Sequence, residues 1–136
     1  MTSPTTTGTN LAFGQEFHLV CPRITRTTLA LYAGASGDHN PVHIDTDACH
    51  AVGIDDVFAH GMLSMAYLSR LLTDHWAQEQ IVSFEVRFSA ITPVNSEPTC
   101  TGTVTKVDDS VAHLDLTVAL PDGTVTLRGA AVVRLG

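Results

Sequence analysis

The segment Y-A-G-A-S-G-D-H-N-P-V-H-I-D, residues 32–45, decides how the rest of the chain is organised. Its second half gathers polar side chains into a short span: Asp38, His39, Asn40, His43 and Asp45. Gly37 can adopt a positive φ, Pro41 fixes its own φ, and Asp and Asn side chains bond their own backbone. Proline also pushes the preceding Asn40 toward an extended conformation. The segment is therefore predicted to be a loop rich in groups that can bind or transfer protons.

A second segment, F-A-H-G-M-L-S-M-A-Y-L-S-R-L-L, follows at residues 58–72. Most positions between Gly61 and Trp76 are apolar on nearly every side of a helical projection, which is typical of a buried helix. We predict a central helix over Met62 to Trp76. Because loops carry function when a rigid scaffold holds them, the polar loop beside this helix is the candidate site.

The remaining elements follow from caps, turns and alternation. A strand over Gln15–Val20 precedes a short helix over Thr28–Ala33 that Thr25 could cap. Thr46–Val52 is predicted to form one or two helical turns, with Asp45 or Thr46 as the cap and Gly53 as the stop.

The C-terminal half changes to a period of two, which predicts strands. In the first strand Val82, Phe84, Val86 and Phe88 alternate with Ser83, Glu85 and Arg87, which predicts one wet face. Asp108-Asp109-Ser110 and Pro121-Asp122-Gly123 are hairpin turns. The predicted strands are Ile81–Phe88, Thr99–Val107, Val111–Leu120 and Thr124–Leu135. This order indicates an α+β fold in which an antiparallel sheet curls around one helix.

Length and charge limit the possible functions. With 136 residues the chain forms one domain, and its first ten residues, rich in Thr, are predicted to be a disordered lead. Seven Lys and Arg oppose fourteen Asp and Glu, giving a net charge of −7, which disfavours a nucleic-acid partner. No apolar run is long enough for a membrane span.

The N-terminus lacks the basic start and apolar stretch of a signal peptide, so we expect a cytoplasmic location. Three widely spaced cysteines, Cys21, Cys49 and Cys100, predict neither a disulfide framework nor a zinc site.

The loop S-G-D-H-N-P-V-H-I-D and the later A-H-G-M-L resemble the MaoC-like family of R-specific enoyl-thioester hydratases and 3R-hydroxyacyl-thioester dehydratases. The resemblance extends to R-F-S-A-I-T-P-V after the helix and to the G-A-A-V-V-R-L ending. It implies a single hotdog domain over residues 11–136, in which a long helix is wrapped by a curved antiparallel sheet. It also implies a homodimer, or a heterodimer with a related hotdog chain.

Carried over residue by residue, the resemblance implies that Asp38 and His43 are catalytic. Asn40 would fix the loop, and the Gly61 backbone N–H would meet the thioester carbonyl. Ser69 matches a serine that bonds the catalytic loop in some members. His60, just before Gly61, is expected to order the turn into the helix and completes the oxyanion and substrate-binding set. One departure is Asn95-Ser96-Glu97, where many members have Gly-Asp.

The chemistry is consistent with these residue types without the resemblance. Adding water to a trans-2-enoyl thioester, carried by CoA or acyl carrier protein, requires groups that accept and supply protons and a donor for an enolate-like oxygen. Asp38 and His43, five residues apart across a Pro-containing turn, can both reach one water. A backbone N–H at the start of the helix suits the developing oxyanion. No metal or other cofactor is then needed, and neither mutation of the pair is expected to change stability much.

Three alternatives stay open at this point. The histidines and aspartates of the loop could bind a metal, although neither H-E-x-x-H nor a cysteine pair is present. The chain could be a non-catalytic hotdog partner subunit or acyl-binding module. It could also be a hotdog acyl thioesterase, although no carboxylate lies in Met62–Thr73 of the helix.

Overall fold

The structure, a computed structural model, describes residues 11–136, so the predicted disordered lead lies outside the described residues. It confirms the α+β class: a five-stranded antiparallel sheet wraps one long helix. The helices are α1 (Arg26–Ser36), α2 (Thr46–Ala51) and α3 (Gly61–Thr73), with short 3₁₀ turns η2 (Pro41–His43) and η3 (Gln78–Gln80). The strands are β1 (Glu16–Val20), β2 (Ile81–Phe88), β3 (Thr99–Val107), β4 (Val111–Ala119) and β5 (Val125–Arg134).

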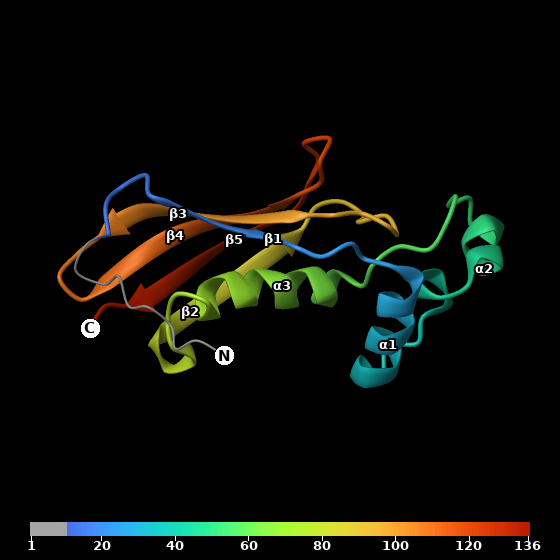
Figure 1. Ribbon diagram of the computed structural model, residues 1–136, viewed down its shortest axis with the longest axis horizontal. Helices are drawn as coiled ribbons and strands as arrows, with labels where there is room; N and C mark the ends of the chain where they lie inside the picture. The colour runs from blue at the N-terminus through green and yellow to red at the C-terminus, as the bar shows by residue number, and fades with distance from the viewer. Residues whose placement is uncertain (1–10) are drawn as a thin grey trace.

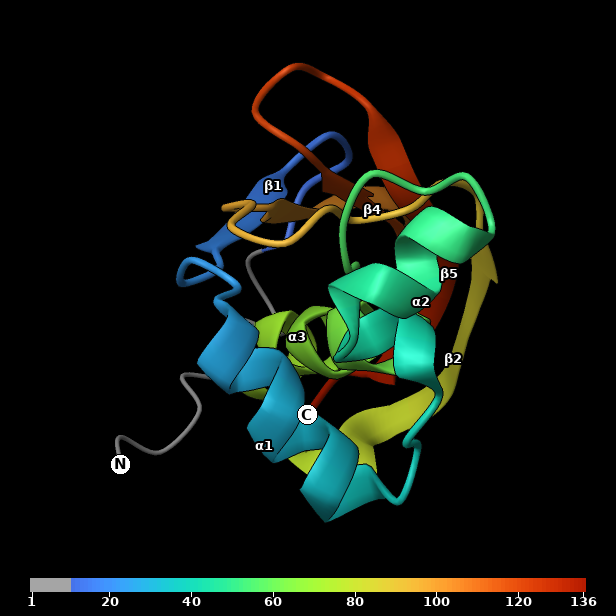
Figure 2. The same cartoon turned by 90° about the vertical axis from the view of Figure 1, so that its right-hand side faces the viewer.

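The sheet has the order β1-β3-β4-β5-β2, so β1 and β2 form its edges. Figure 2 shows the strands curving around α3, while Figure 1 shows α3 lying along the sheet. The two predicted hairpin turns are present and are held by their own aspartates. Oδ1 of Asp108 accepts from the N–H groups of Ser110 and Val111, and Oδ1 of Asp122 accepts from the N–H of Thr124. These backbone donors lower the pKa of both carboxyl groups.

The main core lies between α3 and the concave face of the sheet. Leu68, Leu71 and Leu72 of α3 are fully buried against inward-facing strand residues. Gly102 in β3 permits a close approach, since a Cβ there would lie 3.4 Å from a Leu71 methyl group. Full burial of each leucine contributes about 1.5–3 kcal/mol. The side chains of the strands in this core are Phe17, Cys100, Val104, Ala112, Leu114, Leu116, Val118, Leu127, Ala131 and Val133.

The cysteines are part of this packing. All three thiols are free and buried, and the Sγ atoms of Cys21 and Cys100 lie 3.7 Å apart inside the main core. Burial raises the pKa of the Cys49 thiol, which packs in the second core described below.

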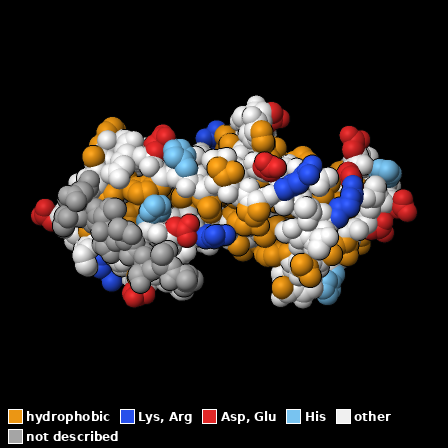
Figure 3. All heavy atoms as spheres, viewed as in Figure 1, with side chains coloured by type: hydrophobic (Ala, Val, Ile, Leu, Met, Phe, Trp, Pro, Cys, Tyr) orange, Lys and Arg blue, Asp and Glu red, His pale blue; other side chains and the backbone are white. Residues whose placement is uncertain are grey.

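The prediction for the central helix needs two corrections. It spans Gly61–Thr73 rather than Met62–Trp76, and Trp76 is buried edge-on against Phe17 just beyond the helix end. The helix is also not covered on every side: one stripe at helical spacing is exposed in the single chain, formed by Met62, Ala66, Arg70 and Thr73. Met62 and Ala66 in this stripe are apolar, so the sequence predicted that the helix is buried on this side as well. Composition does not reveal which face of the helix the sheet covers. Figure 3 shows hydrophobic side chains gathered over the first turns of α3.

The edge strand β2 also differs from the prediction. Phe84 and Val86 pack against the core as expected, but Val82 and Phe88 are 53% and 52% exposed. A register shift between Ile81 and Ser83 in the pairing with β5 breaks the strict alternation at Val82.

The segment from α1 to α2 forms an overhang beyond one end of α3 (Figure 1). A second core joins this overhang to the residues that flank it and to the start of α3; it consists of Ile24, Leu29, Cys49, Val57, Ala59 and Leu63. The predicted caps are confirmed: Thr25 accepts from the N–H of Thr28, and Asp45 accepts from the first N–H groups of α2.

An ion pair ties the overhang together. The Arg26 guanidinium binds both carboxylate oxygens of Asp56, and Thr46 donates to Oδ1 of Asp56 at 2.9 Å. The Arg26 guanidinium holds the pKa of the Asp56 carboxyl well below its usual range. No helix in residues 11–136 is long and apolar enough to cross a membrane.

Candidate active site

The polar loop begins where α1 ends. Gly37 adopts a φ of 79° and its N–H bonds the carbonyl of Ala33, which closes the helix. Asp38 then turns the chain, because its Oδ1 accepts from the N–H of Asn40 at 3.2 Å. Asn40 in turn accepts from the N–H of Val42 at 3.3 Å and, with a ψ of 124°, leads into η2. Short-range bonds of the predicted kind thus fix the loop.

His43 is placed by the segment that precedes α3. Its ring is buried, and Nδ1 lies 2.8 Å from the carbonyl oxygen of Phe58. A carbonyl only accepts, so Nδ1 carries the proton and Nε2 of the neutral ring has the free lone pair. Nε2 lies 3.9 Å from Oδ2 of Asp38, whose side chain is half exposed. The structure therefore brings Asp38 and His43 together, with the basic nitrogen facing the carboxylate.

His60 completes a cluster of three. Its ring stacks on that of His43 with centroids 3.9 Å apart and planes 25° apart. Its Nε2 donates to the main-chain carbonyl of Asp38 at 3.0 Å, and Tyr32 packs edge-on against the ring. Burial lowers the pKa of His60. His60 was expected only to order the turn into the helix. It also joins the polar loop to the start of α3.

Gly61 opens α3 at a position where any Cβ would require the Phe88 ring to move. A Cβ there would lie 2.8 Å from ring atoms of Phe88 in β2. The first N–H groups of a helix have no intrahelical partner and lie at its positive end. A backbone donor is therefore available at this position.

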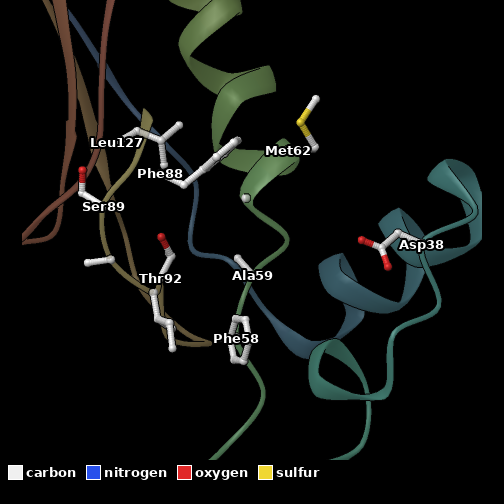
Figure 4. A pocket seen from close by; sticks show the side chains of 11 residues that line it. Asp38, Phe58, Ala59, Met62, Phe88, Ser89, Thr92 and Leu127 are labelled. Carbon is white, nitrogen blue, oxygen red and sulfur yellow. The ribbon is translucent and has the colours of Figure 1, made fainter. Parts of the chain in front are cut away.

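A cavity of about 540 Å³ lies beside these groups. Asp38 lies on one side of it, while Phe88, Leu127 and Thr92 lie on the other (Figure 4). Thr92 is held there because its carbonyl accepts from the N–H of Ala59 at 2.9 Å. The cavity lining consists of Asp38, Phe58, Ala59, Gly61, Met62, Phe88, Ser89, Ala90, Ile91, Thr92 and Leu127. It is mostly apolar, with the carboxylate of Asp38 at its margin.

Ser69 is not brought into this group. It lies eight residues beyond Gly61 on α3, and its Oγ donates to the carbonyl of Ala66 at 2.6 Å. It lines a different hollow with Thr73 and Phe84. The expected bond from Ser69 to the loop is therefore not present in this chain, because the hydroxyl is satisfied within its own helix.

His39 and Asp45 are also separate from the pair. His39 is exposed on the loop, and Asp45 acts as the N-cap of α2, as predicted for it. At the departure from the family pattern, Asn95 adopts a φ of 70°, a left-handed conformation that Asn tolerates better than most residues. The turn therefore has a backbone shape that glycine also adopts.

The cluster of Asp38, His43 and His60 offers one possible metal ligand each, all within 4.8 Å of one another. A metal lies near the plane of each imidazole that binds it, along the lone pair. Two rings stacked at 3.9 Å have separate, nearly parallel planes, so their lone pairs do not converge. His60 also uses Nε2 to bond the loop. The arrangement suits proton transfer better than metal binding.

Comparisons with known proteins identify the family of this chain. Residues 7–123 match the model of the MaoC-like domain family. This chain belongs to the MaoC-like family. The (R)-specific enoyl-CoA hydratase of Rhodospirillum rubrum is 30% identical over 115 residues, which cover 82% of this chain and 80% of that protein.

Two further relatives show how far the likeness extends. The 3-hydroxyacyl-thioester dehydratase Z of Mycobacterium tuberculosis H37Rv is 30% identical over 92 residues, or 63% of this chain, and the match spans 61% of that dehydratase. The solved structure of the (R)-hydratase from A. caviae superposes with a TM-score of 0.82 at 27% identity, covering 93% of this chain and 98% of that one. The hotdog fold of the family is thereby established for this MaoC-like chain, which spans less than two thirds of the length of dehydratase Z.

The residues that sequence reasoning missed are those of the cavity wall. Phe88, Ala90, Ile91 and Thr92 belong to the R-F-S-A-I-T-P-V segment, whose resemblance to the family was the available signal. Nothing in the sequence indicated that the Phe58 carbonyl would orient His43, because every residue type carries a main-chain carbonyl.

Proposed function

We propose that this MaoC-like protein is a hydro-lyase that adds water reversibly to trans-2-enoyl thioesters, giving (3R)-hydroxyacyl thioesters, or catalyses the reverse dehydration. The observation that carries this proposal is the pairing of Asp38 with His43 at 3.9 Å beside the cavity. The R-specific hydratase named above supports the stereochemistry. The thioester would be carried by CoA or by acyl carrier protein.

In the proposed mechanism Asp38 and His43 bind one water between them. As the water oxygen bonds C3 of the enoyl group, one water proton passes to the pair and returns to C2, so the elements of one water are added across the double bond. Negative charge develops on the thioester oxygen during this step. The Gly61 N–H, at the positive end of α3, would donate to that oxygen.

The acyl chain would occupy the cavity beyond Gly61. The side chains there are apolar, chiefly Met62, Phe88, Ile91 and Leu127. The 56% exposure of Met62 and 48% exposure of Ile91 leave this wall partly open in the single chain.

A second hotdog chain would cover this open side. Edge strands expose unpaired backbone groups that invite pairing. Both edges expose a valine, Val82 in β2 and Val20 in β1, but β2 is the longer edge and contains Phe88 of the cavity wall. We therefore place the dimer contact along β2, either with a second copy or with a related hotdog chain.

The purified protein incubated with a 2-enoyl-CoA tests the activity. The proposal predicts loss of the conjugated thioester absorbance and a (3R)-hydroxyacyl product on chiral analysis. Release of free thiol in place of hydration would instead identify a thioesterase. Saturable binding of the enoyl-CoA by the folded dimer without turnover would identify an acyl-binding module, and both outcomes contradict the proposal.

A further inference from the structure

The stacked rings of His43 and His60 differ in how many partners their nitrogens have. This difference determines which of the two rings can take up an additional proton. Two imidazolium rings stacked at 3.9 Å would repel each other strongly, so the pair takes up at most one proton beyond the N–H that each neutral ring carries.

His43 can carry two N–H groups. Its Nδ1–H already donates to the carbonyl of Phe58, and its Nε2 faces the carboxylate of Asp38. Protonation at Nε2 would give that nitrogen a charged acceptor across the site, directly or through the bound water. Both N–H groups of a protonated His43 would thus have a hydrogen-bond acceptor.

His60 can carry only one. Its Nε2–H donates to the carbonyl of Asp38, while Nδ1 is buried and has no hydrogen-bond partner within residues 11–136. The whole residue is 1% exposed. A second proton on Nδ1 would create a buried donor without an acceptor, next to another ring that can be charged. An unprotonated nitrogen in the same place is less unfavourable.

We propose that His60 is a permanently neutral positioning residue, which holds the Asp38 main chain through Nε2–H and leaves His43 as the only ring of the pair that takes up a proton. The inference rests on the proposed function, since it assigns the proton of the hydration reaction to His43 Nε2. His60 itself does not contact the reacting atoms.

The groups that face His60 come from three elements. Tyr32 of α1 packs against its ring edge-on, His43 of η2 stacks on it, and the loop supplies Asp38. Burial and a charged His43 oppose protonation of His60, whereas the hydrogen bond to the Asp38 carbonyl and the Asp38 carboxylate favour it. Burial is the largest of these effects and lowers the pKa of His60.

Nitrogen NMR of the full-length protein tests the neutral state without any activity measurement. With ¹⁵N-labelled histidine, the His60 signals are assigned by their loss in His60→Gln. We expect the Nε2–H neutral form of His60 at every pH from 8 to 5.5. An Nδ1–H form of His60, or its protonation in that range, would overturn the inference even if the enzyme hydrates enoyl thioesters.

Two variants test the positioning role. The amide nitrogen of Gln can replace Nε2–H of His60 but removes the ring, whereas Phe retains a stacked ring and removes the donor. If the bond to Asp38 matters, His60→Gln should retain kcat within a few-fold, and His60→Phe should lose roughly tenfold or more at an unchanged KM. A purely structural role in packing predicts the opposite order, and that order would overturn the inference.

His75→Gln is the matched control. His75 is a half-buried histidine whose pKa burial also lowers, and it packs against Phe17 at the far end of α3 from the site. Its kcat should equal that of the unmodified protein. A loss of kcat in His75→Gln equal to that in His60→Phe would show a general folding effect and would contradict a specific role for His60.

Discussion

Nδ1 of His43 lies 2.8 Å from the carbonyl oxygen of Phe58, so the residue that begins the approach to α3 also sets the tautomer of the candidate base. Through this bond the scaffold determines that Nε2, rather than Nδ1, faces Asp38. The same bond makes His43 part of the packed interior. Its partner Asp38 is half exposed and has no such role in packing.

The two members of the pair should therefore differ in their effects on stability. His43→Ala removes a buried ring and leaves the Phe58 carbonyl without its donor, so we expect a loss of about 1–3 kcal/mol in the free energy of unfolding. Asp38→Asn keeps an oxygen for the Asn40 N–H and should change stability by no more than about 0.5 kcal/mol. Urea denaturation of both variants measures this. Equal stabilities for the two would favour the sequence-based expectation that neither residue matters to folding.

Gly61→Ala should harm both the site and the fold. The added methyl group meets the Phe88 ring at 2.8 Å, and overpacking of this kind costs about 1–3 kcal/mol. We also expect kcat/KM for enoyl-CoA to fall at least about tenfold, because small displacements at a site can lower rates a hundredfold.

The matched control for Gly61→Ala is Gly34→Ala in α1, where a Cβ meets nothing within 4 Å. It should raise the free energy of unfolding by about 0.5–1 kcal/mol, because alanine is the better helix residue. A Gly61→Ala/Phe88→Leu variant should regain part of the lost stability. Unchanged stability and activity in Gly61→Ala alone would rule out the close contact.

The lowered pKa of His60 predicts how stability depends on pH. A neutral buried histidine does not take up the proton that the unfolded chain binds near its ordinary value of about 6.5. Its contribution to stability is therefore undiminished above that value and declines as the pH falls below it, by up to about 1.4 kcal/mol per pH unit for one proton. His60→Gln should lose less stability between pH 7 and pH 5 than the unmodified protein. Urea denaturation at both pH values measures the difference, and identical pH slopes would contradict it.

The proposed dimer contact along β2 predicts a response to charge. Val82→Lys places a charge on the exposed side of that edge, so the protein should sediment as a monomer at micromolar concentration. Val20→Lys, on the exposed part of the opposite edge strand β1, should leave the dimer intact. A monomeric unmodified protein with full activity, or dissociation only in the Val20 variant, would show that the contact is elsewhere or unnecessary.

Local chemistry accounts for what the sequence predicted well. The Thr25 and Asp45 caps and the turns at Asp108 and Asp122 all depend on bonds between near neighbours, so residue type and spacing suffice. The family resemblance supplied the hotdog fold and the candidate pair.

Features that depend on distant contacts were not predictable. The exposed stripe at Met62 depends on which side of α3 the sheet covers, and Val82 depends on a register shift. The stacking of His43 on His60 joins residues seventeen apart in sequence through the path of the intervening chain. For Ser69 the resemblance indicated a bond that the hydroxyl makes instead to Ala66.

The kinetics of four variants test the central claim, that Asp38 and His43 act on one water, most directly. Asp38→Asn and His43→Gln should each lower kcat for enoyl-CoA hydration about 10²–10⁴-fold, since each removes a general acid–base group. Because both groups serve the same water, the double variant should lose far less than the product of the two single losses. His39→Gln, exposed on the same loop, should retain the unmodified rate. Wild-type rates in folded Asp38→Asn and His43→Gln would contradict the account.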